Sequence, residues 1–261
     1  MKKGIIVIMM LFMVFAISAP AKATLMLDSW RLDLRGIDGL ANIAKYNIQD
    51  VKEIEFKGIA HAITFDTNAN LSPDIGELGM TDGFLRSTDL ESSGGLSVGA
   101  ASGLNTDYEM TFDFSMDAIG VDFLTTGKTF SHLASSMPGT STDGLFEIYI
   151  DNLGDANNLV SNTVTGDGFR DGVLIAQFDV LSGDGGVFTK ATYDGSDDAS
   201  FALKWALPNV LFDENGIDLS TYDGSGPLVL LAISDSNYDG DDANVGRFSN
   251  PEPTNWANYS V

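Results

Sequence analysis

The clearest chemical pattern in the sequence is the run from Asp235 to Asp242, which reads D-S-N-Y-D-G-D-D. It matches the opening D-x-N-x-D-G of a calcium loop, in which alternate oxygen ligands converge on the ion and glycine permits a sharp turn. The twelfth loop position is Gly246 instead of a bidentate glutamate, so an EF-hand is not expected. The sequence instead predicts a looser calcium site between strands, and the alternative is a solvated Asp/Gly turn. The predicted ligands are Asp235, Asn237, Asp239 and Asp241.

A second pattern is the tripeptide Tyr-Asp-Gly, which occurs three times. If its tyrosines lie on neighbouring loops, their rings can stack on sugar rings while the aspartates bond the hydroxyls. The predicted glycan ligands are Tyr193, Tyr222 and Tyr238. The alternative is a tyrosine at a strand end followed by an ordinary Asp-Gly turn. The three tryptophans, Trp30, Trp205 and Trp256, are assigned to core or edge packing.

The sequence gives no support for a catalytic site. Gly95-Leu96-Ser97-Val98-Gly99 fits G-x-S-x-G, but that motif needs a strand-to-helix turn followed by an acid and a histidine. Its Ser/Gly-rich flanks predict a loop instead. His61 and His132 lack a carboxylate at metal-ligand spacing, and adjacent acids such as Asp197 and Asp198 do not indicate a glycosidase pair. We predict no catalytic residues and no certain cofactor, with calcium as the one candidate.

Charge and cysteine content restrict the class of protein. The chain has 37 acidic and 14 basic residues, a net charge of −23 and no cysteine. Such a charge repels nucleic acid and anionic membrane surfaces, so no nucleic-acid partner is expected. Cysteine nucleophiles, thiolate metal sites and disulfides are excluded, and the fold must be stabilised by burial.

The first 23 residues resemble a secretory signal peptide. Lys2 and Lys3 precede an apolar run over 5–17, and Ala21-Lys22-Ala23 supplies small residues for cleavage. A membrane-spanning helix needs about 20 apolar residues, so a retained anchor is not expected. We predict cleavage near Ala23 and a protein that is secreted, with the periplasm as the alternative destination.

Short alternating stretches separated by Gly-rich turns predict an all-β fold, a single-domain β-sandwich or jelly roll. The predicted strands lie at 53–65, 108–114, 145–150, 173–180, 187–193, 201–207 and 228–233. A short helix is expected within 36–48 and a long loop over 91–105. The predicted division is a signal peptide (1–23), one β domain (24–250) and a C-terminal tail (251–261).

Four segments carry a family resemblance: D-S-W-R-L-D-L (28–34), G-L-F-E-I-Y-I-D (144–151), 167–183 and 211–237. With them the chain resembles flocculation-associated proteins of the PEP-CTERM group, which are exported by exopolysaccharide-producing bacteria. Members usually end in Pro-Glu-Pro, an apolar helix and an arginine cluster. Here Pro251-Glu252-Pro253 is followed by T-N-W-A-N-Y-S-V, so we expect no stable membrane anchor.

The resemblance implies a non-enzymatic extracellular-matrix protein whose partner is exopolysaccharide or the cell surface. A calcium-stabilised carbohydrate-binding module is the alternative. A secreted glycan hydrolase is a third interpretation, which would require two carboxylates facing each other in a cleft.

Overall fold

The computed structural model describes residues 25–26, 29–40, 42–64, 78–124, 127–132, 145–153, 168–187, 195–222, 228–236 and 256–260. The predicted signal peptide and Pro251-Glu252-Pro253 lie outside these residues. The strands are β1 (Leu25–Met26), β2 (Trp30–Asp33), β3 (Asn47–Thr64), β4 (Leu78–Ser92), β5 (Tyr108–Leu124), β6 (Gly127–His132), β7 (Leu145–Asn152), β8 (Val173–Val187), β9 (Gly195–Ala206), β10 (Leu211–Asp213), β11 (Leu228–Ser236) and β12 (Trp256–Ser260). Three single turns of helix accompany them: η1 (Leu34–Gly36), α2 (Gly99–Ser102) and η2 (Leu219–Thr221).

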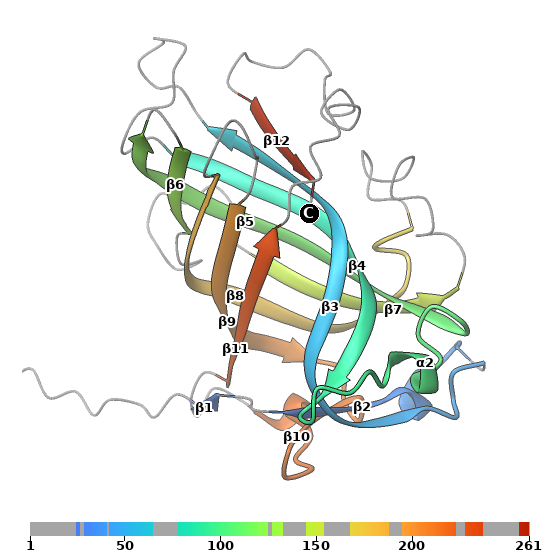
Figure 1. Ribbon diagram of the computed structural model, residues 1–261. Helices are drawn as coiled ribbons and strands as arrows, with labels where there is room; N and C mark the ends of the chain where they lie inside the picture. Colours follow the sequence, from blue (N-terminus) through green and yellow to red (C-terminus); the bar gives the residue numbers. More distant parts are fainter. Residues whose placement is uncertain are drawn as a thin grey trace, which may run out of the picture.

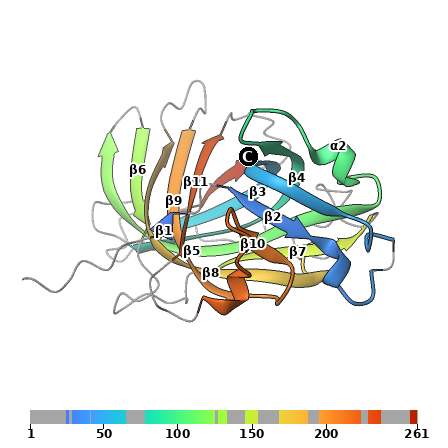
Figure 2. The same ribbon diagram turned by 90° about the horizontal axis from the view of Figure 1, so that it is seen from below.

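The prediction of an all-β fold is confirmed. The strands form one sheet in the order β1-β11-β9-β8-β6-β5-β4-β3-β2-β10, with β7 between β5 and β8 and β12 beside β3. All neighbours are antiparallel except β1 and β11. The sequence predicted the stacked layers of a sandwich, whereas here one sheet curls into a nearly closed cylinder (Figures 1 and 2). The inner face of the curled sheet packs against itself, so one sheet buries its apolar side as two sheets would.

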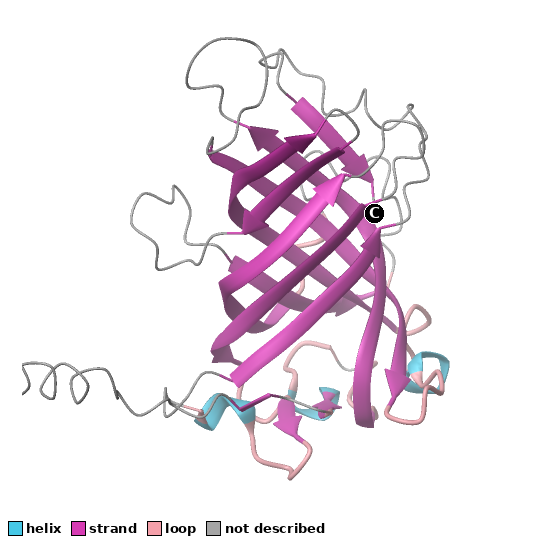
Figure 3. Cartoon of the chain, turned by 60° about the vertical axis from the view of Figure 1, so that its left-hand side comes forward, coloured by secondary structure: helices cyan, strands magenta, loops and turns pink. Residues whose placement is uncertain are grey.

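Two positions in the sheet are each occupied by two strands placed end to end. β7 pairs with the first part of β5 and β8, and β6 pairs with the last part of both. In the same way β2 and β12 follow one another along one edge of β3. β12 therefore brings part of the predicted C-terminal tail into the sheet. β3, β5 and β8 are therefore long enough to pair with both members of an end-to-end pair. Figure 3 shows long strands that run obliquely along most of the cylinder.

Six of the predicted strands lie wholly or mostly within β3, β5, β7, β8, β9 and β11. Of the strand predicted at 187–193, Val187 ends β8 and the rest lies outside the described residues. β4 was not predicted, although it connects β3 to β5 along most of its length. Its sequence, L-G-M-T-D-G-F-L-R-S-T-D-L-E-S, has two glycines and irregular alternation, which hide the strand period.

The helix expected within 36–48 does not form in the described part of that range, 36–40 and 42–48. η1 ends at Gly36, Gly39 has a φ of +88°, and β3 begins at Asn47. A left-handed glycine interrupts a helix, and the chain instead makes tight turns that bury Ile37, Leu40 and Ile43. Their spacing of three residues imitates a helical period. In the loop expected over 91–105, β4 extends to Ser92 and α2 adds one helical turn.

The core centres on phenylalanine rings that extend across the inner face. The ring of Phe146 on β7 lies 5.6 Å from Phe112 on β5, 6.3 Å from Phe178 on β8 and 4.9 Å from Phe201 on β9, measured between ring centroids. Phe56 on β3 continues the row, 6.0 Å from Phe112. These tilted and edge-on contacts join strands from both halves of the sequence, and three of the four ring contacts involve Phe146.

Replacing this central ring should strongly destabilise the fold. Phe146→Ala is expected to lower the free energy of unfolding by about 3–5 kcal/mol, because truncating a buried phenylalanine loses transfer energy and leaves a cavity. Urea denaturation followed by tryptophan fluorescence measures the change. The control is Leu96→Ala, whose side chain is 69% exposed and should change stability by less than about 0.5 kcal/mol. Equal effects of the two variants would contradict this account of the core.

Candidate functional site

The predicted calcium ligands are only partly within the described residues. Asp235 lies in β11 and pairs with Ser196 of β9, so the predicted loop would begin where β11 ends. Asn237, Asp239 and Asp241 lie outside the described residues. On the neighbouring strand, Asp198 pairs with both Ile233 of β11 and Asp184 of β8. Among the side chains that the structure describes, no group of three or more His, Asp or Glu residues is arranged to hold a metal ion.

The calcium prediction can be tested on the whole chain. Calorimetric titration with calcium chloride should show a binding event that Asp239→Ala removes, because the loop would lose a carboxylate ligand. Asp242→Ala is the matched control, since Asp242 stands outside the alternating ligand positions and should leave the binding heat unchanged. A wild-type protein that shows neither calcium heat nor a thermal shift would rule out the site.

Of the predicted glycan ligands, Tyr222 is described, whereas Tyr193 and Tyr238 are not. Tyr222 follows η2, packs against the core, and its hydroxyl donates to Asp213 Oδ2 at 3.0 Å. The other oxygen of Asp213 accepts the backbone N–H groups of Asn215 at 2.9 Å and Ile217 at 2.7 Å. Burial, together with the hydrogen bond to Asp213, raises the pKa of Tyr222. In the described structure this tyrosine therefore fastens the turn after β10, and its role in glycan binding stays a prediction.

Ser97 of the G-x-S-x-G stretch has a structural hydrogen bond. Its hydroxyl donates to Asp89 Oδ1 at 2.8 Å, and the same oxygen accepts the backbone N–H of Gly99 at 3.2 Å. Ser97 also forms an isolated bridge with Glu91 of β4. His61 lies in β3 and His132 in β6, where their backbones take part in the sheet. The serine thus fastens the loop after β4, in agreement with the prediction of a loop.

Four carboxylates lie side by side on β3 and β4. The register places Glu53 opposite Glu91 and Glu55 opposite Asp89. Desolvation raises the pKa of Glu91, and repulsion from the other three carboxylates adds to the effect. Like charges directly opposite one another destabilise an antiparallel pair. This cluster therefore works against folding at neutral pH.

Glu91→Gln should raise the melting temperature at about pH 7. The pKa of Glu91 is raised in the folded state. The wild-type protein is therefore not destabilised by this group below the ordinary glutamate range, and it loses stability as the pH rises through the raised pKa. The advantage of the variant should therefore shrink as the pH is lowered and when salt screens the repulsion. Differential scanning calorimetry across pH measures it, with the exposed Asp38→Asn as control. A melting temperature unchanged at neutral pH and low salt would refute the repulsion.

The feature that sequence inspection missed is a row of side chains across the outer face of the sheet. Residues paired across strands share a face, and the registers connect Trp205 of β9, Gln177 of β8, Glu147 of β7, Asp113 of β5 and Phe84 of β4. We call these five residues the outer row. The adjacent positions, which include Phe146, Phe178 and Phe112, carry the buried inner face. The outer row therefore lies opposite the phenylalanine core.

Hydrogen bonds hold the middle of the outer row. Gln177 Nε2 donates to Glu147 Oε1 at 2.7 Å, and the hydroxyl of Tyr149 donates to Glu147 Oε2 at 2.7 Å. Burial is the main cause that raises the pKa of Tyr149, and the bond to Glu147 adds to it, so this hydroxyl keeps its proton. Each carboxylate oxygen thus accepts one protein donor and has a further lone pair. Two donors therefore hold Glu147 in one orientation, and acceptor capacity remains on its carboxylate.

One end of the outer row is open. Trp205 is 41% exposed, so of the core or edge packing that the sequence suggested, a core position is excluded. Beside it, Lys204 Nζ forms an ion pair with Asp179 Oδ1 at 3.0 Å. This pairing offsets charge next to the indole in a protein that is otherwise strongly acidic. An aromatic surface therefore stands next to an amide and a carboxylate that are already oriented.

The other end of the row is covered by the segment just before β8. Phe169 is fully buried against Phe84, with ring centroids 5.6 Å apart, and its carbonyl accepts the hydroxyl of Thr111 at 2.9 Å. Arg170 pairs with Asp113 at 2.5 Å and lies over the ring of Phe84, 4.9 Å from its centroid. A ligand on the outer row would therefore meet Trp205, Gln177 and Glu147, while Arg170 covers the far end.

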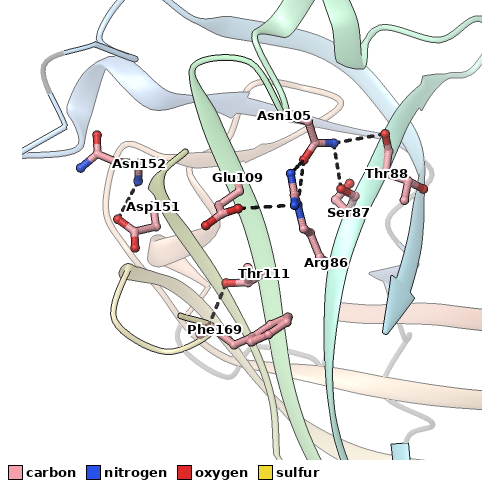
Figure 4. Close-up of polar contacts among 9 residues, drawn as sticks. All are labelled: Arg86, Ser87, Thr88, Asn105, Glu109, Thr111, Asp151, Asn152 and Phe169. Carbon is pink, nitrogen blue, oxygen red and sulfur yellow. Dashed lines mark hydrogen bonds and ion pairs between the residues drawn. The ribbon is translucent and has the colours of Figure 1, made fainter. Parts of the chain in front are cut away.

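A buried polar network supports the sheet beside this covered end (Figure 4). Glu109 of β5 is fully buried, and its Oε2 lies 3.6 Å from Arg86 Nε of β4. Arg86 also donates to Asn105 Oδ1, through Nη2 at 2.6 Å and Nε at 3.0 Å. The amide of Asn105 donates to the carbonyls of Ser87 and Thr88 at 3.0 and 3.3 Å. Arg86 thus compensates the buried charge of Glu109 through an ion pair and, with Asn105, fastens the loop after α2 to β4.

Within the described residues, no helix has the length and apolar content needed to cross a membrane. No protein-family model, curated protein or solved structure matches the chain.

Proposed function

We propose that the chain is a non-enzymatic exported protein of a bacterial extracellular matrix, which holds polysaccharide on the open end of the outer row. The observation that supports this most directly is the exposed indole of Trp205 next to Gln177 and Glu147. A sugar ring has an apolar face that an indole can cover, and hydroxyls that an amide and a carboxylate can bind. The signal-like N-terminus and the family resemblance support the same role from the sequence.

The chemistry favours neutral sugar units. Glu147 and the overall charge of −23 repel uronate or sulfate groups, and Lys204 is already paired with Asp179. The hydrogen-bonding capacity that remains is mainly that of acceptors, because Gln177 Nε2 and the Tyr149 hydroxyl already donate to Glu147. Neutral hexose hydroxyls can donate to such acceptors without bringing a negative charge near them.

The proposal predicts that Trp205→Ala weakens binding to a neutral glucan by about tenfold or more, because exposed aromatic anchors supply a large share of contact energy in binding sites. Affinity electrophoresis in gels containing dextran, and separately polygalacturonate, measures the effect. Leu181→Ala, which removes a side chain of β8 that is 37% exposed, is the matched control and should bind as wild type. Both variants should keep the wild-type melting temperature within a few degrees, since the replaced side chains are substantially exposed.

The cellular role is tested with the same variants. A strain lacking the gene should flocculate less, and the Leu181→Ala protein should restore aggregation where Trp205→Ala does not. Unchanged aggregation in the deletion strain, under conditions in which the wild type makes the protein, would overturn the matrix role. Equal glucan binding by wild type and Trp205→Ala would overturn the site.

A further inference from the structure

The turn after β10 contains the one Asn-Gly pair of the chain, Asn215-Gly216. Both residues are exposed, and the space beside Gly216 is open, since a Cβ added there would meet no atom within 4 Å. In such a pair the backbone nitrogen of the glycine can reach the side-chain amide carbon of the asparagine, because the glycine has no side chain that hinders the approach. Asn215 is therefore chemically able to form a succinimide ring, the first step of deamidation.

The fold itself requires a glycine at this position. The N–H of Asp213 donates to the Ile217 carbonyl at 2.9 Å, and the N–H of Gly216 donates to the Asp213 carbonyl at 3.0 Å. Gly216 has a φ of +79°, which glycine adopts without strain, so the loop has the geometry of a three-residue hairpin connection that ends in a left-handed residue. We call residues 213–217 the Asn215 turn. The glycine that permits this turn is the same one that makes Asn215 reactive.

While it is closed, the Asn215 turn opposes the reaction. The nucleophile is the Gly216 nitrogen after loss of its proton, and this N–H is bonded to the Asp213 carbonyl. The backbone N–H of Asn215 donates to Asp213 Oδ1 at 2.9 Å, and its side-chain amide donates to Glu214 Oε1 at 3.2 Å. Both parts of Asn215 are thus held in place, and the two nearby carboxylates disfavour a new negative charge. The turn must open before the ring can close.

Tyr222 controls how easily the Asn215 turn opens. Asp213 is buried, and its Oδ1 accepts the N–H groups of Asn215 and Ile217. Its other oxygen, Oδ2, accepts the Tyr222 hydroxyl at 3.0 Å. Burial and this hydrogen bond raise the pKa of Tyr222, so its hydroxyl keeps its proton and continues to donate in mildly alkaline solution. The tyrosine therefore holds the carboxylate that closes the turn.

We infer that Asn215 is a site of spontaneous deamidation in this protein, and that the hydrogen bond from Tyr222 to Asp213 limits its rate. When the turn opens, the Gly216 nitrogen loses its proton to solvent and forms a bond to Asn215 Cγ. The bond from Cγ to Nδ2 breaks, and Nδ2 takes up a proton and leaves as ammonia. Water then adds to either carbonyl of the succinimide and gives aspartate or isoaspartate at position 215.

The products should not close the turn as before. In isoaspartate the main chain runs through the former side chain, which lengthens the backbone and disrupts the hydrogen bond from Gly216 to Asp213. Either product also adds a negative charge beside Asp213 and Glu214. Because β10 pairs with β2, the modification loosens this end of the sheet, and it acts in one direction only. The inference is independent of the proposed glycan site.

Incubation of the full chain in mildly alkaline buffer tests the inference. Peptide mapping by mass spectrometry should find the mass gain of deamidation at Asn215 before it appears at any other asparagine. Asp-Gly pairs such as Asp38-Gly39 can form the same ring, but they return to their starting mass on hydrolysis and do not contribute to the signal. The native protein should react several times more slowly than the same chain unfolded in urea, because the turn opens only transiently in the native state.

Two tyrosine variants test the role of the hydrogen bond. Tyr222→Phe removes the hydroxyl and keeps the ring, and it should raise the native rate at Asn215 by about two- to tenfold, the effect of losing one hydrogen bond on the opening of the turn. Tyr149→Phe is the matched control, since it removes a hydroxyl that donates to a carboxylate, Glu147, on β7. Its rate at Asn215 should equal that of wild type. In urea all three proteins should react equally fast.

Each result decides for or against the inference. It is overturned by a native protein that keeps Asn215 intact over a period in which the unfolded chain deamidates, or by native and unfolded chains that react equally fast. A Tyr222→Phe protein that reacts no faster than Tyr149→Phe would also overturn it. A native rate raised by Tyr222→Phe alone, with equal rates in urea, would establish that this hydrogen bond protects Asn215.

Discussion

The fold depends on the interior row of phenylalanines. The chain has no cysteine, so no covalent bond links strands that are distant in sequence, and burial must do so. The ring of Phe146 contacts rings from β5, β8 and β9, and Phe112 extends the row to β3. Because these rings must all face inward, they determine the register of the strands that carry them.

That register in turn creates the outer row. A shift of one residue between two strands would turn every inward side chain outward. The same constraint that puts Phe146 inside therefore puts Glu147 outside, in line with Gln177 and Trp205. A bulge between Gln177 and Phe178 adjusts the pairing of β8 with β9. The binding face that we propose is thus a consequence of core packing, and its geometry should be as rigid as the core behind it.

The sequence indicates where many of the strands lie, but it says much less about which strands are neighbours in the sheet. The alternation of apolar and polar residues at 108–114 and 145–150 predicted β5 and β7, because this pattern is visible within a single strand. Ile37, Leu40 and Ile43 were misjudged as helical because their spacing suits a helix as well as successive turns, and only the left-handed Gly39 separates the two.

The outer row could not be predicted from local sequence patterns. Trp205, Gln177 and Glu147 are far apart in the chain, and they meet only because of strand order and register, which a local pattern does not contain. For the same reason the sequence drew attention to Tyr222, whose motif is conspicuous but whose hydroxyl is bonded to Asp213. The calcium ligands and the other two tyrosines remain predictions.

The end-to-end arrangement of β6 with β7, and of β2 with β12, has a consequence for the dynamics of the chain. The long strands β5 and β8 are each bordered by one partner in one half and a different partner in the other. Cooperative opening follows shared contacts rather than strand identity. One half of a single strand can therefore exchange its amide protons while the other half, held by the phenylalanine row, stays closed. The units of local unfolding in this protein would run around the cylinder as two rings, across the strands instead of along them.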